Sequence, residues 1–237
     1  MITKRWGVIA ALSLIVGACQ PLTELPYDRS AASVKSIGIV TPVFPTEPVA
    51  ALASTVGQSF GLIGALVDMG MNADRVDRLE KVLAEQHFAA QQIFLERLTS
   101  ALQAEGYTVT AIAVPRNQQQ KLLATYPPRA ETKVDAYLDM YVGEYGYFAA
   151  GISDSTPYRP HFTVHGRLVR SDNASVLMED SVVYNPLGQA TNIITISPDP
   201  AAQYTTFNLL IADPVGATKR LRAAEEQSAD AFAKLLK

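Results

Sequence analysis

Apolar and polar side chains alternate over residues 134–148 in the pattern of a half-buried β-strand. In the first part of this stretch every second position is apolar, and the positions between carry mainly tyrosine and aspartate. Successive side chains of a strand point to opposite faces of a sheet, so the apolar set is expected to face the protein core. This set consists of Ala136, Leu138, Met140 and Val142.

Two further strand-like stretches, residues 161–170 and 175–184, follow along the chain. The segment that joins them is Ser171, Asp172, Asn173 and Ala174. Serine, aspartate and asparagine favour tight turns because their side chains hydrogen-bond to nearby backbone groups. The pattern therefore predicts a β-hairpin.

Apolar residues recur at intervals of three and four over residues 72–105, which is the spacing of one face of a helix. They are Leu79, Val82, Leu83, Phe88, Ile93, Phe94, Leu98 and Leu102. Gly106 follows, and glycine often ends a helix because it adopts the left-handed backbone conformation easily. One long helix is therefore expected here. A second amphipathic helix is expected over residues 213–237, with Pro214 in its first turn.

Short β-branched stretches flank the long helix. Residues 34–41 precede it and end at Pro42, and residues 107–114 follow it and end at Pro115. Both stretches are predicted to be strands, because proline cannot donate a ladder hydrogen bond and so marks where a strand ends. A short helix is expected over residues 117–125.

The order of these elements predicts a single α/β domain over residues 34–237. Its fold class is a layered sandwich in which a mixed, mostly antiparallel β-sheet is packed by long helices. The chain has 237 residues, of which 48% are hydrophobic, and this suits one globular domain. The net charge of −3 lacks the basic excess of a nucleic-acid-binding protein. A single cysteine excludes a disulfide framework within the chain.

Residues 49–71 are almost uncharged and contain Gly57, Gly61 and Gly64. The spacing of the first two glycines lets a helix approach a neighbouring helix closely. Three interpretations stay open for a helix in this segment. It is buried between the sheet and the next helix, it forms a contact between copies of the chain, or it inserts into a membrane.

The first eighteen residues have the layout of a secretory signal peptide. Lys4 and Arg5 precede an apolar run, which is too short to span a membrane, and small residues follow it. The sequence Val16-Gly17-Ala18-Cys19 resembles the lipobox of bacterial lipoproteins.

The lipobox resemblance implies cleavage before Cys19 and attachment of fatty acyl chains such as palmitate to its thiol and to the new amino terminus. More than one acyl chain gives stable membrane attachment. Gln20 replaces the aspartate that commonly retains lipoproteins in the inner membrane, and this favours the outer membrane, facing the periplasm. Residues 19–33 are expected to form a lipidated tether, because residues 20–33 are polar and contain two prolines.

No catalytic group, metal site or cofactor is expected. His161 and His165 lie on a predicted strand, where four residues span about 13 Å, which is too far for one shared metal ion. His87 stands alone on the long helix. The sequence contains neither a nucleophile elbow nor a phosphate-binding glycine loop.

The tyrosines of residues 134–148 are the strongest candidate for a binding surface. Tyrosine combines a large rigid contact area with a polar tip, which suits recognition. The candidate binding residues are Tyr137, Asp139, Tyr141, Tyr145 and Tyr147, which share one parity of the strand. The alternative is that this face is covered by the closing helix or is an ordinary half-exposed sheet face.

The folded part resembles envelope lipoproteins that assist curli secretion or activate penicillin-binding proteins. The resemblance rests on the strand that ends at Pro42, the helix stopped by Glu105-Gly106-Tyr107, and the strand of residues 134–145 that leads into a hairpin. It implies a lipid-anchored periplasmic accessory protein for assembly or transport, which binds another envelope protein.

Two other functions are possible for this sequence. One is an oligomeric, membrane-inserting or pore-forming envelope component that uses residues 49–71, and in that case the chain forms a homo-oligomer. The other is a hydrolase of envelope material, which requires a cleft with a perturbed carboxylate or a histidine pair.

Overall fold

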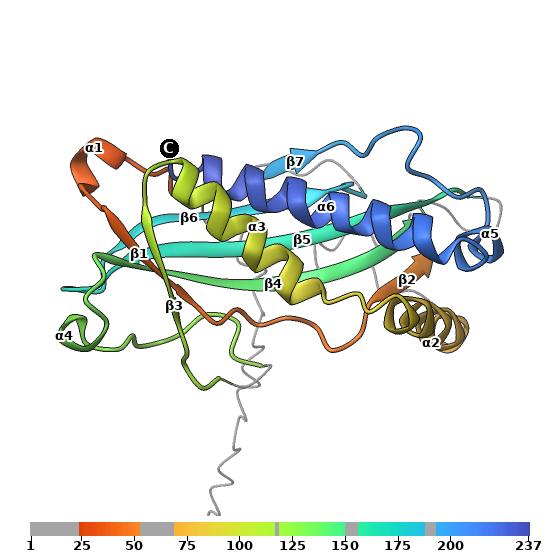
Figure 1. Ribbon diagram of the computed structural model, residues 1–237, viewed down its shortest axis with the longest axis horizontal. Helices are drawn as coiled ribbons and strands as arrows, with labels where there is room; N and C mark the ends of the chain where they lie inside the picture. Colours follow the sequence, from red (N-terminus) through yellow and green to blue (C-terminus); the bar gives the residue numbers. More distant parts are fainter. Residues whose placement is uncertain (1–23, 53–68, 117–118, 150–155, 188–192) are drawn as a thin grey trace, which may run out of the picture.

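The computed structural model describes residues 24–52, 69–116, 119–149, 156–187 and 193–237. Within them a mixed sheet runs along the molecule, and helices cover one of its faces (Figure 1). The strands are β1 (Ser36–Val40), β2 (Val49–Leu52), β3 (Thr108–Ile112), β4 (Ala136–Ala149), β5 (Tyr158–Arg170), β6 (Val176–Tyr184) and β7 (Ile194–Ile196). The predicted α/β fold with a mixed sheet packed by helices is confirmed.

The strands lie in the order β3-β1-β4-β5-β6-β7, and β2 pairs with the far half of β4. β4, β5 and β6 form the long antiparallel part of the sheet, and the hairpin predicted between β5 and β6 is confirmed. β1 pairs in parallel with both β3 and β4, and β7 pairs in parallel with β6. β1 and β2 therefore lie end to end along the same edge of β4.

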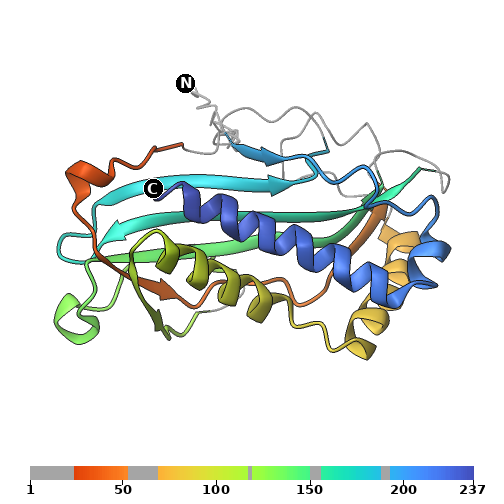
Figure 2. The same ribbon diagram turned by 45° about the horizontal axis from the view of Figure 1, so that its top comes forward.

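The described helices are α1 (Arg29–Ala32), α2 (Met69–Glu85), α3 (Ala90–Ala104), α4 (Arg129–Thr132), α5 (Phe207–Ile211) and α6 (Pro214–Lys234). α3 and α6 lie side by side across the same face of the sheet (Figure 2). The predicted closing helix is confirmed. Asp213 caps it by accepting a hydrogen bond from the amide of Gly216 at 3.0 Å, and Pro214 occupies the first turn.

The prediction of one long helix over residues 72–105 is wrong, because the chain turns between α2 and α3. His87 has φ 51°, and the amides of His87 and Phe88 donate to the carbonyls of Ala84 and Leu83. This pair of bonds is a Schellman motif, with histidine in the left-handed position that glycine usually takes. Gly106 closes α3 with the same motif and φ 90°, so its predicted role is confirmed.

Three other segments differ from the prediction. Residues 49–52 form strand β2 instead of the start of a helix. Residues 119–125 form turns and irregular backbone, and the short helix α4 lies further along the chain. Residues 24–33, expected to belong to a tether, pack on the domain, because Leu25 exchanges two backbone hydrogen bonds with Glu179.

The main core lies between the sheet and helices α3 and α6. Its largest fully buried side chains include Phe94 from α3, Phe162 from β5 and Phe232 from α6. None of the helices in the described ranges is long and apolar enough to cross a membrane.

Candidate functional site

The five candidate residues of β4 do not share one face of the sheet. The pairing of β4 with β5 shifts register between Val142 and Glu144. A β-bulge adds one residue, so every side chain after it changes face. Tyr145 and Tyr147 therefore point into the main core together with the predicted apolar set, and the shared face predicted for the tyrosines is wrong at these two positions.

Asp139 lies on the opposite face, where it is fully buried and accepts hydrogen bonds from several groups. The guanidinium of Arg116 donates to Oδ1 at 2.5 Å. The amide of Leu123 and the hydroxyl of Tyr126 donate to Oδ2 at 2.7 and 2.8 Å. Arg167 of β5 lies 4.0 Å from Oδ2 and also donates to the Tyr126 hydroxyl at 2.9 Å. Charge-assisted hydrogen bonds of this kind are among the stronger ones.

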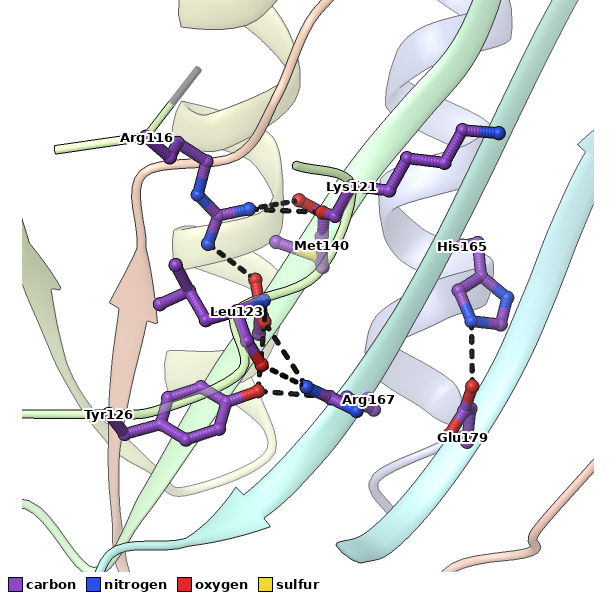
Figure 3. Close-up of polar contacts among 9 residues, drawn as sticks. Arg116, Lys121, Leu123, Tyr126, Met140, His165, Arg167 and Glu179 are labelled. Carbon is purple, nitrogen blue, oxygen red and sulfur yellow. Dashed lines mark hydrogen bonds and ion pairs between the residues drawn. The ribbon is translucent and has the colours of Figure 1, made fainter. Parts of the chain in front are cut away.

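This network fastens the segment that follows Arg116 to the sheet. Arg116 also donates to the carbonyls of Lys121 and Met140 (Figure 3). Tyr137 stacks on Tyr126 with ring centroids 5.4 Å apart and donates to the carbonyl of Pro127 at 2.8 Å. Asp139 and Tyr137 are thus occupied by contacts within the domain.

Tyr141 borders a row of polar side chains that crosses β5 and β6. The ammonium group of Lys121 lies 5.0 Å from the centroid of the Tyr141 ring, and the centroid of the His165 ring lies 5.2 Å from it. A cation at this distance is attracted by the ring quadrupole. Burial, together with the charge of Glu179, raises the pKa of Tyr141, so its hydroxyl stays protonated at neutral pH.

Ser181, His165 and Glu179 form a hydrogen-bonded row with the order of a hydrolytic triad. Ser181 Oγ lies 2.8 Å from His165 Nδ1, and His165 Nε2 lies 3.0 Å from Glu179 Oε1. Burial lowers the pKa of His165, and this fits a neutral ring that accepts from the serine and donates to the glutamate. Ser181 is only 5% exposed, and its amide donates to Asp180 at 2.6 Å, so that amide is not free to stabilise an oxyanion.

The two histidines of β5 have separate partners. His161 Nδ1 lies 3.0 Å from the carbonyl oxygen of Asn185, and its Nε2 lies 3.5 Å from the carboxylate of Glu144. Within the described ranges, no group of three or more His, Cys, Asp and Glu side chains could hold a metal ion.

A groove of about 560 Å³ lies on the helical side of the molecule, at the start of α3. The residues that line it are Phe44, Pro45, Ala89, Ala90, Gln91, Gln92, Leu95, Glu96 and Tyr145. Its volume lies in the range of small-ligand sites, and its wall is mostly apolar with a few polar groups. Of the five candidate residues predicted on β4, Tyr145 is the one that lines this groove.

Tyr145 of the groove wall is influenced by three carboxylates. Burial, followed by the charges of Glu225, Glu80 and Glu47, raises the pKa of Tyr145 to about 12. Glu225 of α6 is fully buried, and both of its carboxylate oxygens lack a hydrogen-bond partner in the described part of the chain. Burial raises the pKa of Glu225 well above its usual value, opposed by the nearby charge of Arg222.

Glu225 was missed in the sequence, although a signal exists. It lies four residues after Leu221 and three before Ser228, so it interrupts the apolar stripe of the closing helix with a charge. The other predicted residues, Cys19 and the three glycines at positions 57, 61 and 64, lie outside the described residues.

No protein-family model matches the sequence, and no curated protein sequence matches it. Several solved structures are similar in fold. The PelC dodecamer from Paraburkholderia phytofirmans is 10% identical, with coverage of 91% of this chain and 95% of that chain and a TM-score of 0.37. Protein XCC0632 from Xanthomonas campestris is 11% identical, with coverage of 92% and 85% and a TM-score of 0.37.

Lipoprotein GNA1162 from Neisseria meningitidis is 18% identical, with coverage of 63% of this chain and 81% of that chain and a TM-score of 0.31. At sequence identities this low, the similarity is one of fold alone. Because the TM-scores lie below 0.5, the likeness to these proteins carries no conclusion about the function of this chain.

Proposed function

We propose that this chain is a lipid-anchored protein of the cell envelope that binds another envelope component and performs no catalysis. The observation that carries the proposal is the lipobox sequence that ends at Cys19, followed closely by a folded domain. Leu25 is already paired with β6. Six residues of extended chain reach about 20 Å at most, so the domain is held close to the bilayer.

Anchoring changes what a weak binding site can achieve. A tethered domain meets partners at the same membrane at a high effective concentration without any additional contact. The outer membrane, facing the periplasm, is the proposed location, because Gln20 does not match the inner-membrane retention signal.

Binding is favoured over catalysis by a comparison of the polar row on β5 and β6 with the groove beside Tyr145. Ser181 and His165 are buried, and the amide of Ser181 is already bonded. The groove beside Tyr145, in contrast, is open to a ligand. The oligomeric or membrane-inserting alternative stays a prediction, because residues 53–68 lie outside the described residues.

Metabolic labelling with an alkyne analogue of palmitate tests the anchor. The wild-type protein is expected to carry the label, and Cys19→Ser is expected to lose it completely, because the chain has no other thiol. Gln20→Asp is the matched control, which should keep the label but move to the inner membrane of a two-membrane host. Labelling of Cys19→Ser, or an unlabelled wild-type protein, would contradict the proposal.

A further inference from the structure

Strand β3 forms one edge of the sheet, beyond β1 (Figure 2). Among the described residues, β1 is the one strand that pairs with β3, and the two run parallel without a shift of register. The exposed residues of β3 are Thr108, Thr110 and Ala111, and its half-buried residues are Val109 and Ile112. The side of β3 that faces away from β1 is therefore accessible along the strand.

The backbone of β3 offers hydrogen-bond donors and acceptors along this outer side. The amide of Thr108 points toward β1, because it donates to the carbonyl of Lys35 at 2.9 Å. The carbonyl of Ile112 also points toward β1, where it accepts a hydrogen bond at 3.1 Å. Backbone groups of alternate residues point to opposite sides of a strand. The amides and carbonyls of Val109 and Ala111 therefore point away from β1.

The features that usually prevent an edge strand from pairing with another chain are missing from β3. Natural edges are protected by charged residues, prolines, bulges or very short strands. Residues 107–114 contain no charged residue and no proline, and the pairing of β3 with β1 contains no bulge. At the opposite edge of the sheet, in contrast, β7 is only three residues long. The outer side of β3 is therefore a template for an additional strand.

The side chains of β3 define the chemistry of the strand that fits beside it. Val109 packs against the main core on one face of the sheet, and Ile112 packs against a smaller cluster on the other face. Side chains that lie opposite each other on neighbouring strands share a face, and β-branched side chains pack well there. Residues 107–114 carry no charge, so a charged side chain beside them finds no counter-ion on this strand. The complementary strand is therefore uncharged and rich in β-branched residues.

The length of this edge favours a flexible segment of a partner over a second copy of the folded domain. The five residues of β3 extend about 17 Å. A stable interface between folded proteins buries about 800 Å² on each partner, and one pair of short strands does not supply this area by itself. An extended segment, in contrast, gains affinity from main-chain hydrogen bonds. Tethering at the same membrane raises its effective concentration.

We infer that the outer edge of β3 binds an extended, uncharged segment of another envelope protein, which adds a strand to the sheet through hydrogen bonds to Val109 and Ala111. The added strand runs antiparallel, since this pairing is the more stable one per residue. Apolar β-branched side chains then lie opposite Val109, and threonine lies opposite Thr110 on the other face. The inference rests on the proposed function, because the segment belongs to the envelope component that the protein is proposed to bind.

The test measures the fluorescence anisotropy of labelled peptides mixed with the mature protein in a non-ionic detergent. The probe is a seven-residue peptide of alternating threonine and valine that is N-methylated at its threonines. The methyl groups block one side of the peptide, so it cannot form larger sheets, while its valine amides stay free to pair with β3. The control peptide has the same side chains and is N-methylated at every residue. We expect it to bind at least about tenfold more weakly, because it has no backbone donors.

Two substitutions at Ala111 locate the site. Ala111→Pro removes an outer donor and places the proline ring in the path of the added strand, but it removes no hydrogen bond to β1. This variant should lose binding of the probe. Ala111→Thr is the matched control, which keeps the amide and should bind the probe as the wild-type protein does. Circular dichroism checks the fold of both variants, and if Ala111→Pro does not fold, the comparison of the two peptides still decides.

The outcomes separate this inference from the function on which it rests. Equal affinity for the two peptides, no binding of the probe, or unchanged binding to folded Ala111→Pro would overturn the inference. Sedimentation velocity tests for a second copy at the same edge. A wild-type dimer that Ala111→Pro converts into monomers would assign the edge to a contact between copies and would also overturn the inference. The labelling of Cys19 decides the anchoring independently of these results.

Discussion

The carboxylate of Asp139 holds the segment that follows Arg116 on the sheet. It is fully buried and pairs with Arg116, while Leu123 and Tyr126 donate to its other oxygen. Removing the charge leaves the buried side chain of Arg116 without its counter-ion. Asp139→Asn is therefore expected to lower the free energy of unfolding by about 3–5 kcal/mol, measured by urea denaturation.

The control for this prediction is Asp230→Asn. Asp230 pairs with Arg97 at 2.6 Å, but both side chains are partly exposed, so the expected loss is below about 1 kcal/mol. Similar losses for the two variants would show that Asp139 does not anchor the segment.

Glu225 makes the stability of the fold depend on pH. Burial raises its pKa in the folded state, so the fold binds this proton more tightly than the unfolded chain does. The free energy of unfolding should then fall as the pH rises above about 4.3, the ordinary pKa of glutamate, and continue to fall up to the raised pKa. The free energy of unfolding of Glu225→Gln should not show this decline with pH.

Thermal unfolding at two pH values tests the prediction. Glu225→Gln should match the wild-type protein near pH 4 and have the higher Tm at pH 8, by about 2–4 °C for each kcal/mol gained. A variant that is less stable at pH 8 would contradict this account of Glu225.

At the scale of elements, Gly146 allows β2 to pair with β4. It has φ 142°, and a Cβ atom built there would lie 2.1 Å from the carbonyl oxygen of Val49. Gly146→Ala therefore combines backbone strain with a clash against backbone and is expected to cost at least ~2 kcal/mol in urea denaturation.

Gly106→Ala serves as the comparison, because Gly106 also has a positive φ but its nearest neighbour would be 3.8 Å from the added Cβ. Strain alone should cost about 1 kcal/mol there. If Gly146→Ala is the milder of the two, the steric account of the β2–β4 contact is wrong.

The elements that could be predicted from the sequence are those with an uninterrupted local pattern. The hairpin of β5 and β6 has turn residues between two strand-like runs, and α6 has a capping aspartate, an early proline and an apolar stripe. The break at His87 was missed because a histidine takes the left-handed position, which the sequence does not mark. The sequence does not mark the bulge beside Gly143 either, and this bulge reversed the faces of Tyr145 and Tyr147.

At the scale of the whole molecule, the α/β class could be predicted because strands and helices alternate along the chain. The position of β2 beside the far half of β4 depends on contacts between distant residues, which no local pattern reports. The candidate site shows the same limit. Tyr145 was predicted for its chemistry, whereas its neighbours Phe44 and Leu95 come from other elements and meet it only in the fold.

Mass spectrometry of the native protein purified from membranes tests the central claim most directly. The account predicts an amino-terminal peptide that begins at Cys19 and carries fatty acyl groups on both its sulfur and its amino group. A peptide that begins at Met1, together with an unmodified Cys19 thiol, would contradict the lipid anchor and with it the proposed place of this protein in the cell envelope.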